Sequence, residues 1–155
     1  MEVNYVIGDL VIKDFIKVKQ NCTNWQNAIE IGTSLLEDKG IVENEYKEQI
    51  INNFKELGPY MVIAPGIVLS HARPEAGVNE TGISLVTLKE PINFGSEQND
   101  PVKLVVTLAA KDNTSHLELL SNLMDIFMNS EDLNKIFEAK SENEILEVLK
   151  KYKEK

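Results

Sequence analysis

Apolar side chains recur at helical spacing over two segments in the first third of the chain. Between residues 23 and 40 they lie three or four positions apart, which predicts an amphipathic helix, and a second such pattern covers residues 44–57. Thr23 and Gln26 have the spacing of a capping box, which predicts the start of the first helix. The segment before these helices predicts a short helix and then a strand near residues 15–18.

After residue 58 the pattern changes to short runs of apolar and β-branched residues, which are typical of buried strands. Between the last two of these runs, residues 91–101 are rich in Asn, Asp, Gly and Pro and predict a loop. The predicted strands cover residues 60–64, 67–69, 82–88 and 102–109.

Helical spacing returns in the last third of the chain and predicts three further helices. Ser115 with Glu118 and Ser141 with Glu144 fit capping boxes, and Ser130 is the expected cap of a short helix between them. Helices followed by strands and again by helices predict an α/β fold, in which helices cover a central sheet.

The composition favours one globular domain over residues 1–155 and excludes several classes of protein. Apolar residues make up 43% of the 155 residues and charged residues 26%, which argues against wholesale disorder. The net charge of −9 argues against nucleic-acid binding. No apolar run is long enough to span a bilayer and no signal peptide is evident, so we expect a cytoplasmic protein without membrane insertion.

His71 and Arg73 are the first candidates for chemistry. His71 directly follows a predicted strand, at a place where α/β proteins often carry reactive groups. Arg73 is the only arginine in the chain, and its guanidinium can bind two phosphate oxygens at once. The alternatives are an ordinary surface histidine and a surface ion pair between Arg73 and Glu75.

His116, the only other histidine, follows Ser115 in the first turn of a predicted helix. The positive end of the helix dipole would lower the pKa of its imidazole. Free backbone N–H groups in the same turn could bind an anion such as a phosphoryl group. The alternative is a histidine at a helix start without any special role.

Three other chemistries have weaker support. Two distant histidines and one cysteine are a poor donor set for zinc, so we expect no metal. Cys22 has no visible activating partner and is better explained as a small buried thiol. The chain also lacks the Gly-rich run ending in Lys-Ser/Thr that a P-loop needs, which argues against intrinsic use of ATP or GTP.

The residues around His71 resemble a known family. Residues 58–78, with the sequence GPYMVIAPGIVLSHARPEAGV, resemble the active-site segment of enzyme IIA proteins of the phosphotransferase system, in the mannitol/fructose superfamily. The GPYxVIAPG lead-in is most similar to the ascorbate-type branch, and the resemblance extends over about residues 15–150. It implies a single type-2 IIA domain, with a mixed central sheet flanked by helices.

The resemblance also implies a function. His71 would be the histidine that is phosphorylated by the phosphocarrier protein HPr, and it would pass the phosphoryl group to a cysteine of a IIB protein. The membrane component IIC would be an indirect partner. His116 matches the supporting histidine of the family, and Arg73 is a phosphate or partner contact. No cofactor is implied, and Cys22 does not lie in the kind of loop that a fused IIB would need.

Two positions depart from the pattern of the family. Ser70 stands where proline usually precedes the active histidine, and its hydroxyl could bond to the imidazole or the phosphate. Asn53 stands near the position of an arginine in mannitol-type relatives, which argues against mannitol and leaves ascorbate or a related sugar as the expected substrate. The alternative function is a regulatory IIA-like protein, whose phosphorylation state controls a partner.

Overall fold

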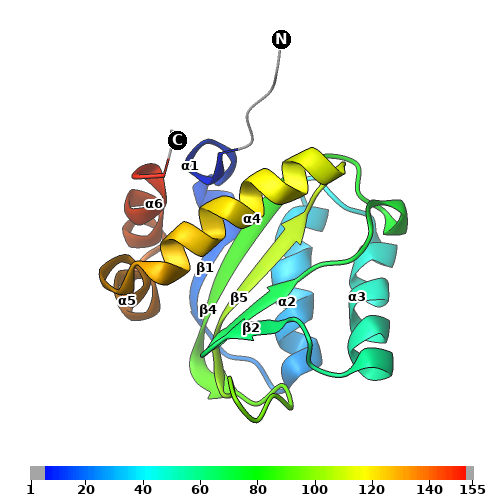
Figure 1. The fold of residues 1–155 in the computed structure, drawn as a ribbon, viewed down its shortest axis with the longest axis horizontal. Helices are drawn as coiled ribbons and strands as arrows, with labels where there is room; N and C mark the ends of the chain where they lie inside the picture. Colours follow the sequence, from blue (N-terminus) through cyan, green and yellow to red (C-terminus); the bar gives the residue numbers. More distant parts are fainter. Residues whose placement is uncertain (1–5, 153–155) are drawn as a thin grey trace.

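A mixed five-stranded sheet forms the centre of the computed structural model, which describes residues 6–152 (Figure 1). The strands lie in the order β1-β4-β5-β3-β2. β1 pairs in parallel with β4, and β3 with β5, whereas the β4–β5 and β2–β3 pairs are antiparallel. This confirms the expected α/β fold. The strands are β1 (Ile16–Gln20), β2 (Val62–Ala64), β3 (Ile67–Ser70), β4 (Gly82–Ile92) and β5 (Val102–Ala109).

Six α-helices and two short 3₁₀ helices complete the described part of the chain. α2 packs on one face of the sheet with α3 beside it, whereas α4 crosses the opposite face (Figure 1). α5 and α6 lie at the β1 end of the sheet, near α1. The helices are α1 (Ile7–Leu10), η1 (Lys13–Phe15), α2 (Trp25–Glu37), α3 (Asn44–Leu57), η2 (Pro74–Ala76), α4 (Asn113–Met128), α5 (Ser130–Glu138) and α6 (Glu142–Lys150).

Two of the three inner strands, β4 and β5, are buried on both faces over most of their length. Residues 82–88 of β4 and 104–109 of β5 are all buried, which explains why these runs do not alternate between apolar and polar positions. β4 continues to Ile92, so the predicted loop begins later than residue 91. Pro91 lies in the exposed end of this strand, where the missing backbone donor is tolerated.

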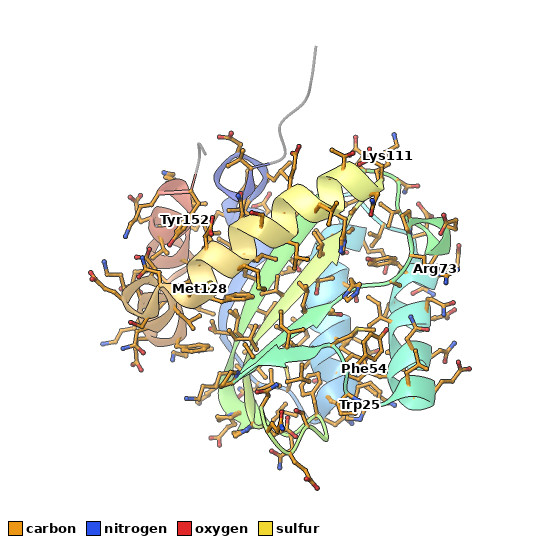
Figure 2. The ribbon with its side chains drawn as sticks, in the orientation of Figure 1. Trp25, Phe54, Arg73, Lys111, Met128 and Tyr152 are labelled. Atoms are coloured by element: carbon orange, nitrogen blue, oxygen red, sulfur yellow. The ribbon has the colours of Figure 1, made fainter. Side chains whose placement is uncertain are left out.

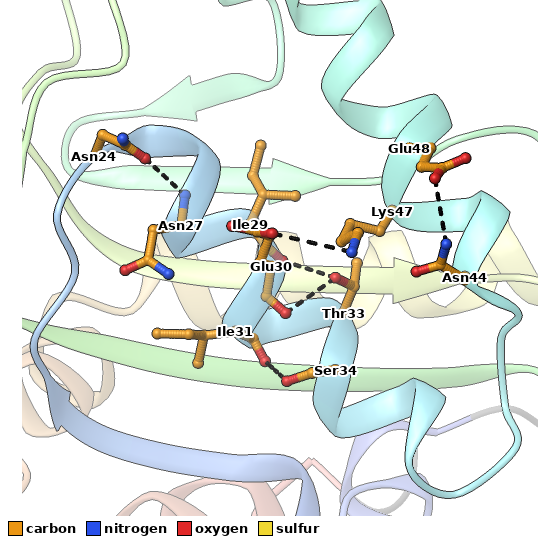
Figure 3. A network of polar contacts seen from close by, with 10 residues as sticks. All are labelled: Asn24, Asn27, Ile29, Glu30, Ile31, Thr33, Ser34, Asn44, Lys47 and Glu48. Atoms are coloured by element: carbon orange, nitrogen blue, oxygen red, sulfur yellow. Dashed lines mark hydrogen bonds and ion pairs between the residues drawn. The ribbon is translucent and has the colours of Figure 1, made fainter.

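Asparagine, not the predicted hydroxyl residue, caps two of the helices. Asn24 accepts the N–H of Asn27 at 2.8 Å and begins α2 (Figure 3). The predicted cap Thr23 lies outside the helix. Likewise Asn129, not Ser130, caps α5. In both cases an equally good cap lies next to the predicted one, and sequence spacing alone did not separate them. The predicted capping box at Ser141 is confirmed.

Polar contacts on the surface of the α2–α3 pair contribute little to its stability. Lys47 of α3 lies 4.0 Å from the carboxylate of Glu30 on α2, and Asn44 donates to Glu48 at 3.3 Å (Figure 3). Exposed ion pairs of this kind stabilise a fold by about 0–1 kcal/mol. An aromatic cluster joins the two helices more firmly, with the rings of Trp25 and Phe54 5.2 Å apart (Figure 2).

Asp132 anchors the end of α6 to α5. Asp132 is buried, and its carboxylate accepts the hydroxyl of Tyr152 at 2.6 Å and pairs with the Lys151 ammonium at 2.5 Å. The hydrogen bond from Lys151 is the main reason why the pKa of Asp132 is lowered. Burial and the neighbouring Asp132 charge raise the pKa of Tyr152 to about 12, so this hydroxyl remains a donor.

Gly32 sets the distance between α2 and the sheet. Its carbonyl accepts the hydroxyl of Ser84 at 2.7 Å, which brings the helix backbone onto β4. A Cβ atom at this position would lie 2.4 Å from Thr107 Oγ1, which is closer than nonbonded contact allows. Only glycine therefore fits the helix at this point of the sheet.

We expect Gly32→Ala to lower the free energy of unfolding by about 1–3 kcal/mol, because overpacking outweighs the better helix propensity of alanine. Urea unfolding followed by circular dichroism measures this. Thr107→Ala removes the clashing hydroxyl and should recover part of the loss in the double variant. Ser34→Ala, at an exposed position of the same helix, is the control. Wild-type stability of Gly32→Ala would contradict the close approach.

Candidate active site

An open pocket of about 1240 Å³ lies where the adjacent strands β3 and β5 end. The segments that follow these strands line it together with one side of α3. Arg73 and Lys111, from the two different segments, lie at the same end of the molecule (Figure 2). The lining residues are Gln49, Asn53, Leu57, Tyr60, 71–76, Leu108, 110–113 and His116.

His71 is the first residue after β3, and its ring orientation is set by the strand that precedes it. The ring nitrogen Nδ1 lies 2.9 Å from the carbonyl oxygen of Leu69. A carbonyl oxygen can only accept, so Nδ1 must carry the proton in this hydrogen bond. The other nitrogen, Nε2, is then unprotonated in the neutral ring. Because the half-buried His71 also lines the pocket, the site can offer a nucleophilic lone pair.

His116 lies beside His71, although the two residues are far apart in the sequence. The ring centroids are 5.9 Å apart and the ring planes are tilted by 49°. His116 is the fourth residue of α4, and its own N–H already bonds to the Asp112 carbonyl at 3.2 Å. Burial and then the nearby His71 lower the pKa of His116. The neutral form of His116 is therefore favoured in this pocket.

The start of α4 differs from the prediction. The capping box joins Asp112 to Ser115, so the helix begins at Asn113 and the predicted box of Ser115 with Glu118 is wrong. The Asp112 carboxylate accepts the Ser115 N–H at 2.8 Å, and this bond is the main reason why the pKa of Asp112 is lowered. A donor expected to be free for an anion is thus used by the chain itself.

Arg73 and Ser70 have different places in the site. Arg73 is exposed and lines the pocket, and within residues 6–152 the structure records no ion pair between it and Glu75. Ser70 is fully buried, its hydroxyl has no hydrogen-bond partner in the described structure, and it does not line the pocket. The imidazole of His71 bonds to the Leu69 carbonyl instead. We therefore assign Ser70 no direct contact with a phosphate.

Two features of the site were missed by the sequence analysis. The hydroxyl of the fully buried Tyr46 lies between the segment after His71 and β5, donating to the Leu108 carbonyl at 2.6 Å. A tyrosine within an otherwise apolar helical stripe was the available signal, because a buried hydroxyl needs a partner. The backbone N–H of Lys111 bonds to Thr81 Oγ1 at 3.0 Å, which fixes the loop before α4.

The α3 wall of the pocket carries amides where mannitol-type relatives are expected to carry an arginine. Asn53 lines the pocket, and its Oδ1 accepts the Nε2 of Gln49 at 2.9 Å. The structure thus places Asn53 on the pocket wall. Its neutral side chain can donate hydrogen bonds but supplies no positive charge.

The structure was also searched, over the residues that it describes, for an activated thiol, a metal site and a membrane span. Cys22 is half-buried and outside the pocket, and burial raises the pKa of its thiol. No three His, Cys, Asp or Glu side chains among the described residues lie close enough to hold a metal ion. None of the described helices has the length and hydropathy of a membrane span.

Comparison with known proteins decides the family. The model of the family "Phosphoenolpyruvate-dependent sugar phosphotransferase system, EIIA 2" matches residues 9–152. The chain belongs to this family. It is 38% identical over 135 residues to the ascorbate-specific PTS system EIIA component of Escherichia coli (strain K12), covering 86% of this chain and 88% of that protein.

Solved structures of the same family share the fold. The mannitol-specific cryptic phosphotransferase enzyme IIA CmtB from Escherichia coli superposes with a TM-score of 0.86 at 31% identity, over 94% of this chain and 98% of that one. The IIA protein in a complex of enzyme IIAMTL with phosphorylated enzyme IIBMTL from Escherichia coli has a TM-score of 0.79 at 23% identity, over 90% and 96% of the two chains. At that identity the second likeness shows the fold alone.

The depressed pKa of His116 generates a prediction. Its ring should titrate below the ordinary value of about 6.5, and in His71→Gln the pKa should rise because the nearby charge is lost. As pH falls below about 6.5 the unfolded chain takes up a proton that the folded chain still excludes, so His116 reduces stability down to its own pKa. An NMR pH titration of the ring nitrogens tests this. An unchanged pKa in His71→Gln would contradict the coupling.

Proposed function

We propose that this chain is the phosphocarrier IIA component of an ascorbate-type phosphotransferase system. His71 accepts a phosphoryl group from phospho-HPr and transfers it to a cysteine of a IIB protein. The observation that carries the proposal is the His71 ring itself, whose Nδ1–H is bound to the Leu69 carbonyl while the ring lies beside His116 in an open pocket. Membership of the EIIA 2 family supports this assignment.

The first step is attack of His71 Nε2 on the phosphorus of phospho-HPr. The Nε2–P bond forms while the bond from phosphorus to the donor nitrogen of HPr breaks. The proton on Nδ1 stays in place, so the His71 ring gains the positive charge that the donor ring gives up. The Leu69 carbonyl, 2.9 Å from Nδ1, stabilises this charged ring because it accepts a hydrogen bond from it.

The second step reverses this chemistry toward IIB. The thiolate of the IIB cysteine attacks phosphorus, the S–P bond forms, and the Nε2–P bond breaks with its electron pair returning to Nε2. The ring leaves as neutral imidazole, a good leaving group, because Nδ1 has kept its proton throughout. In both steps the protein mainly positions the reactants and stabilises charge, as is usual in phosphoryl transfer.

His116 supports the transferring group as a neutral hydrogen-bond donor. Its depressed pKa keeps one ring nitrogen protonated and the other free at neutral pH, so the ring can donate a hydrogen bond to a phosphoryl oxygen. Arg73 and Lys111 at the pocket rim supply the positive charge that phosphoryl oxygens and an approaching partner require. The open pocket leaves the His71 ring accessible to HPr in the first step and to IIB in the second.

Ascorbate or a related sugar acid is the substrate that we assign to the whole system, and this chain acts in the cytoplasm on protein partners only. The support is the similarity to the ascorbate-specific component of Escherichia coli and the neutral amide of Asn53 on the pocket wall. IIC takes part indirectly, because it carries the sugar that phosphorylated IIB modifies. The EIIA component need not contact the sugar itself.

Incubation with phosphoenolpyruvate, enzyme I and HPr should add one acid-labile phosphoryl group to the wild-type chain, and His71→Ala should remain unmodified. Intact-mass spectrometry measures both. Tyr152→Phe, far from the pocket, is the matched control and should be charged like the wild type. If wild-type protein gains no mass from competent phospho-HPr, the phosphocarrier role is wrong. Charging without transfer to an ascorbate-type IIB would instead favour the regulatory alternative.

His116→Ala should still be charged on His71 but should transfer to IIB roughly tenfold to thousandfold more slowly, because it lacks a donor to the moving phosphoryl group. Single-turnover transfer from the isolated phosphoprotein to an ascorbate-type IIB measures this rate. Wild-type transfer by His116→Ala would remove His116 from the mechanism.

A further inference from the structure

The hydroxyl of Tyr46 lies between β5 and the segment that follows β3. Tyr46 comes from α3 and is fully buried. Its hydroxyl accepts the Ala72 N–H at 3.0 Å and lies 2.6 Å from the Leu108 carbonyl oxygen. The Ala72 carbonyl is farther away, at 3.3 Å, so Leu108 is the main acceptor of the hydroxyl proton.

The register of β3 and β5 shows which backbone hydrogen bond the Tyr46 hydroxyl replaces. β3 and β5 are parallel, and the last pair of residues in register is Ser70 with Thr107. In a parallel ladder, the next hydrogen bond along would join the Ala72 N–H directly to the Leu108 carbonyl. These are the two groups that the Tyr46 hydroxyl joins. One side-chain oxygen has therefore taken the place of a backbone hydrogen bond.

The backbone hydrogen bond that Tyr46 replaces lies next to His71. His71 stands between Ser70, which is the last residue paired in the ladder, and Ala72, which is bound to Tyr46. The Tyr46 hydroxyl lies between the two segments at that point, and Ala72 and Leu108 both line the pocket. Because the backbone on both sides of His71 is held, the Nδ1 contact to the Leu69 carbonyl is also held.

We propose that Tyr46 is a positioning residue for phosphoryl transfer, whose hydroxyl replaces the hydrogen bond between Ala72 and Leu108 and so ends the β3–β5 pairing at His71. The inference rests on the proposed function of His71. Burial raises the pKa of Tyr46 to about 12, so the hydroxyl keeps its proton and can donate to Leu108 while it accepts from Ala72. Phenylalanine fills the same space but can do neither.

Tyr46→Phe tests the proposal, with Tyr152→Phe as the matched control. Each variant removes one hydroxyl that donates at 2.6 Å to a buried acceptor, but only Tyr46 lies next to the pocket. The measurements are the rate of His71 charging at saturating phospho-HPr, the KM for phospho-HPr, the unfolding midpoint, and the ¹⁵N NMR signals of the His71 ring, which report which nitrogen carries the proton.

We expect Tyr46→Phe to lower the saturated rate by roughly tenfold to hundredfold with little change in KM, because the nucleophile is displaced while the partner surface is intact. The fraction of His71 rings protonated on Nδ1 should fall in the same variant. Tyr152→Phe should lower the unfolding midpoint and leave both the rate and the ring signals as in the wild type.

A Tyr46→Phe variant with the wild-type rate and ring signals, and only a lower unfolding midpoint, would overturn the proposal. If wild-type protein is not charged at all, the proposed function fails, but the ring signals still test whether Tyr46 positions His71. If Tyr46→Phe does not fold, the wild-type protein provides the test. A slowly exchanging Tyr46 hydroxyl proton with a cross-peak to the Ala72 amide supports the arrangement, and its absence overturns it.

Discussion

The parallel pairing of β3 with β5 is the constraint on which the site depends. Because the two strands run in the same direction as neighbours, the segments that follow them reach the same edge of the sheet. His71 follows β3 directly. His116 lies in the first turn of α4, which follows β5 after a short loop. Their rings meet at 5.9 Å although 45 positions separate them in the sequence, from 71 to 116. A strand order that separated β3 from β5 would separate the two histidines.

The hydrogen bond of His71 Nδ1 to the Leu69 carbonyl sets the protonation of the His71 ring in the pocket. The Leu69 carbonyl holds a proton on His71 Nδ1, which leaves Nε2 free to act as the nucleophile in the proposed phosphoryl transfer. The lowered pKa of His116, caused by burial and by the nearby His71, favours a neutral ring beside it. The Asp112 carboxylate, an anion beside a site for phosphate, is directed into the helix cap by Ser115. An acidic chain can thus present a pocket that tolerates a phosphoryl group.

Buried hydroxyl groups at the sheet differ in whether they have a hydrogen-bond partner. Those of Tyr46 and Ser84 each bond to a backbone carbonyl, and both bonds join a helix to the sheet. The hydroxyls of Ser70 and Thr107, which are paired in register, have no partner in the described structure. Such unpaired groups are normally costly to bury. Gly32 packs directly against one of them, so the close approach of α2 to the sheet leaves little room for any other arrangement.

The sequence alone determined most of the helices and strands and the family, whereas the tertiary structure decided how the candidate site residues are arranged. Periodicity predicted the helices and strands because amphipathic and buried segments need those patterns locally, and the lead-in to His71 identified the family. The true caps Asn24 and Asn129 were missed, since the adjacent Thr23 and Ser130 are about equally good caps in isolation. Local patterns also carry no information about register. Only the packed sheet buries the Ser70 hydroxyl away from the pocket and brings Tyr46 between Ala72 and Leu108.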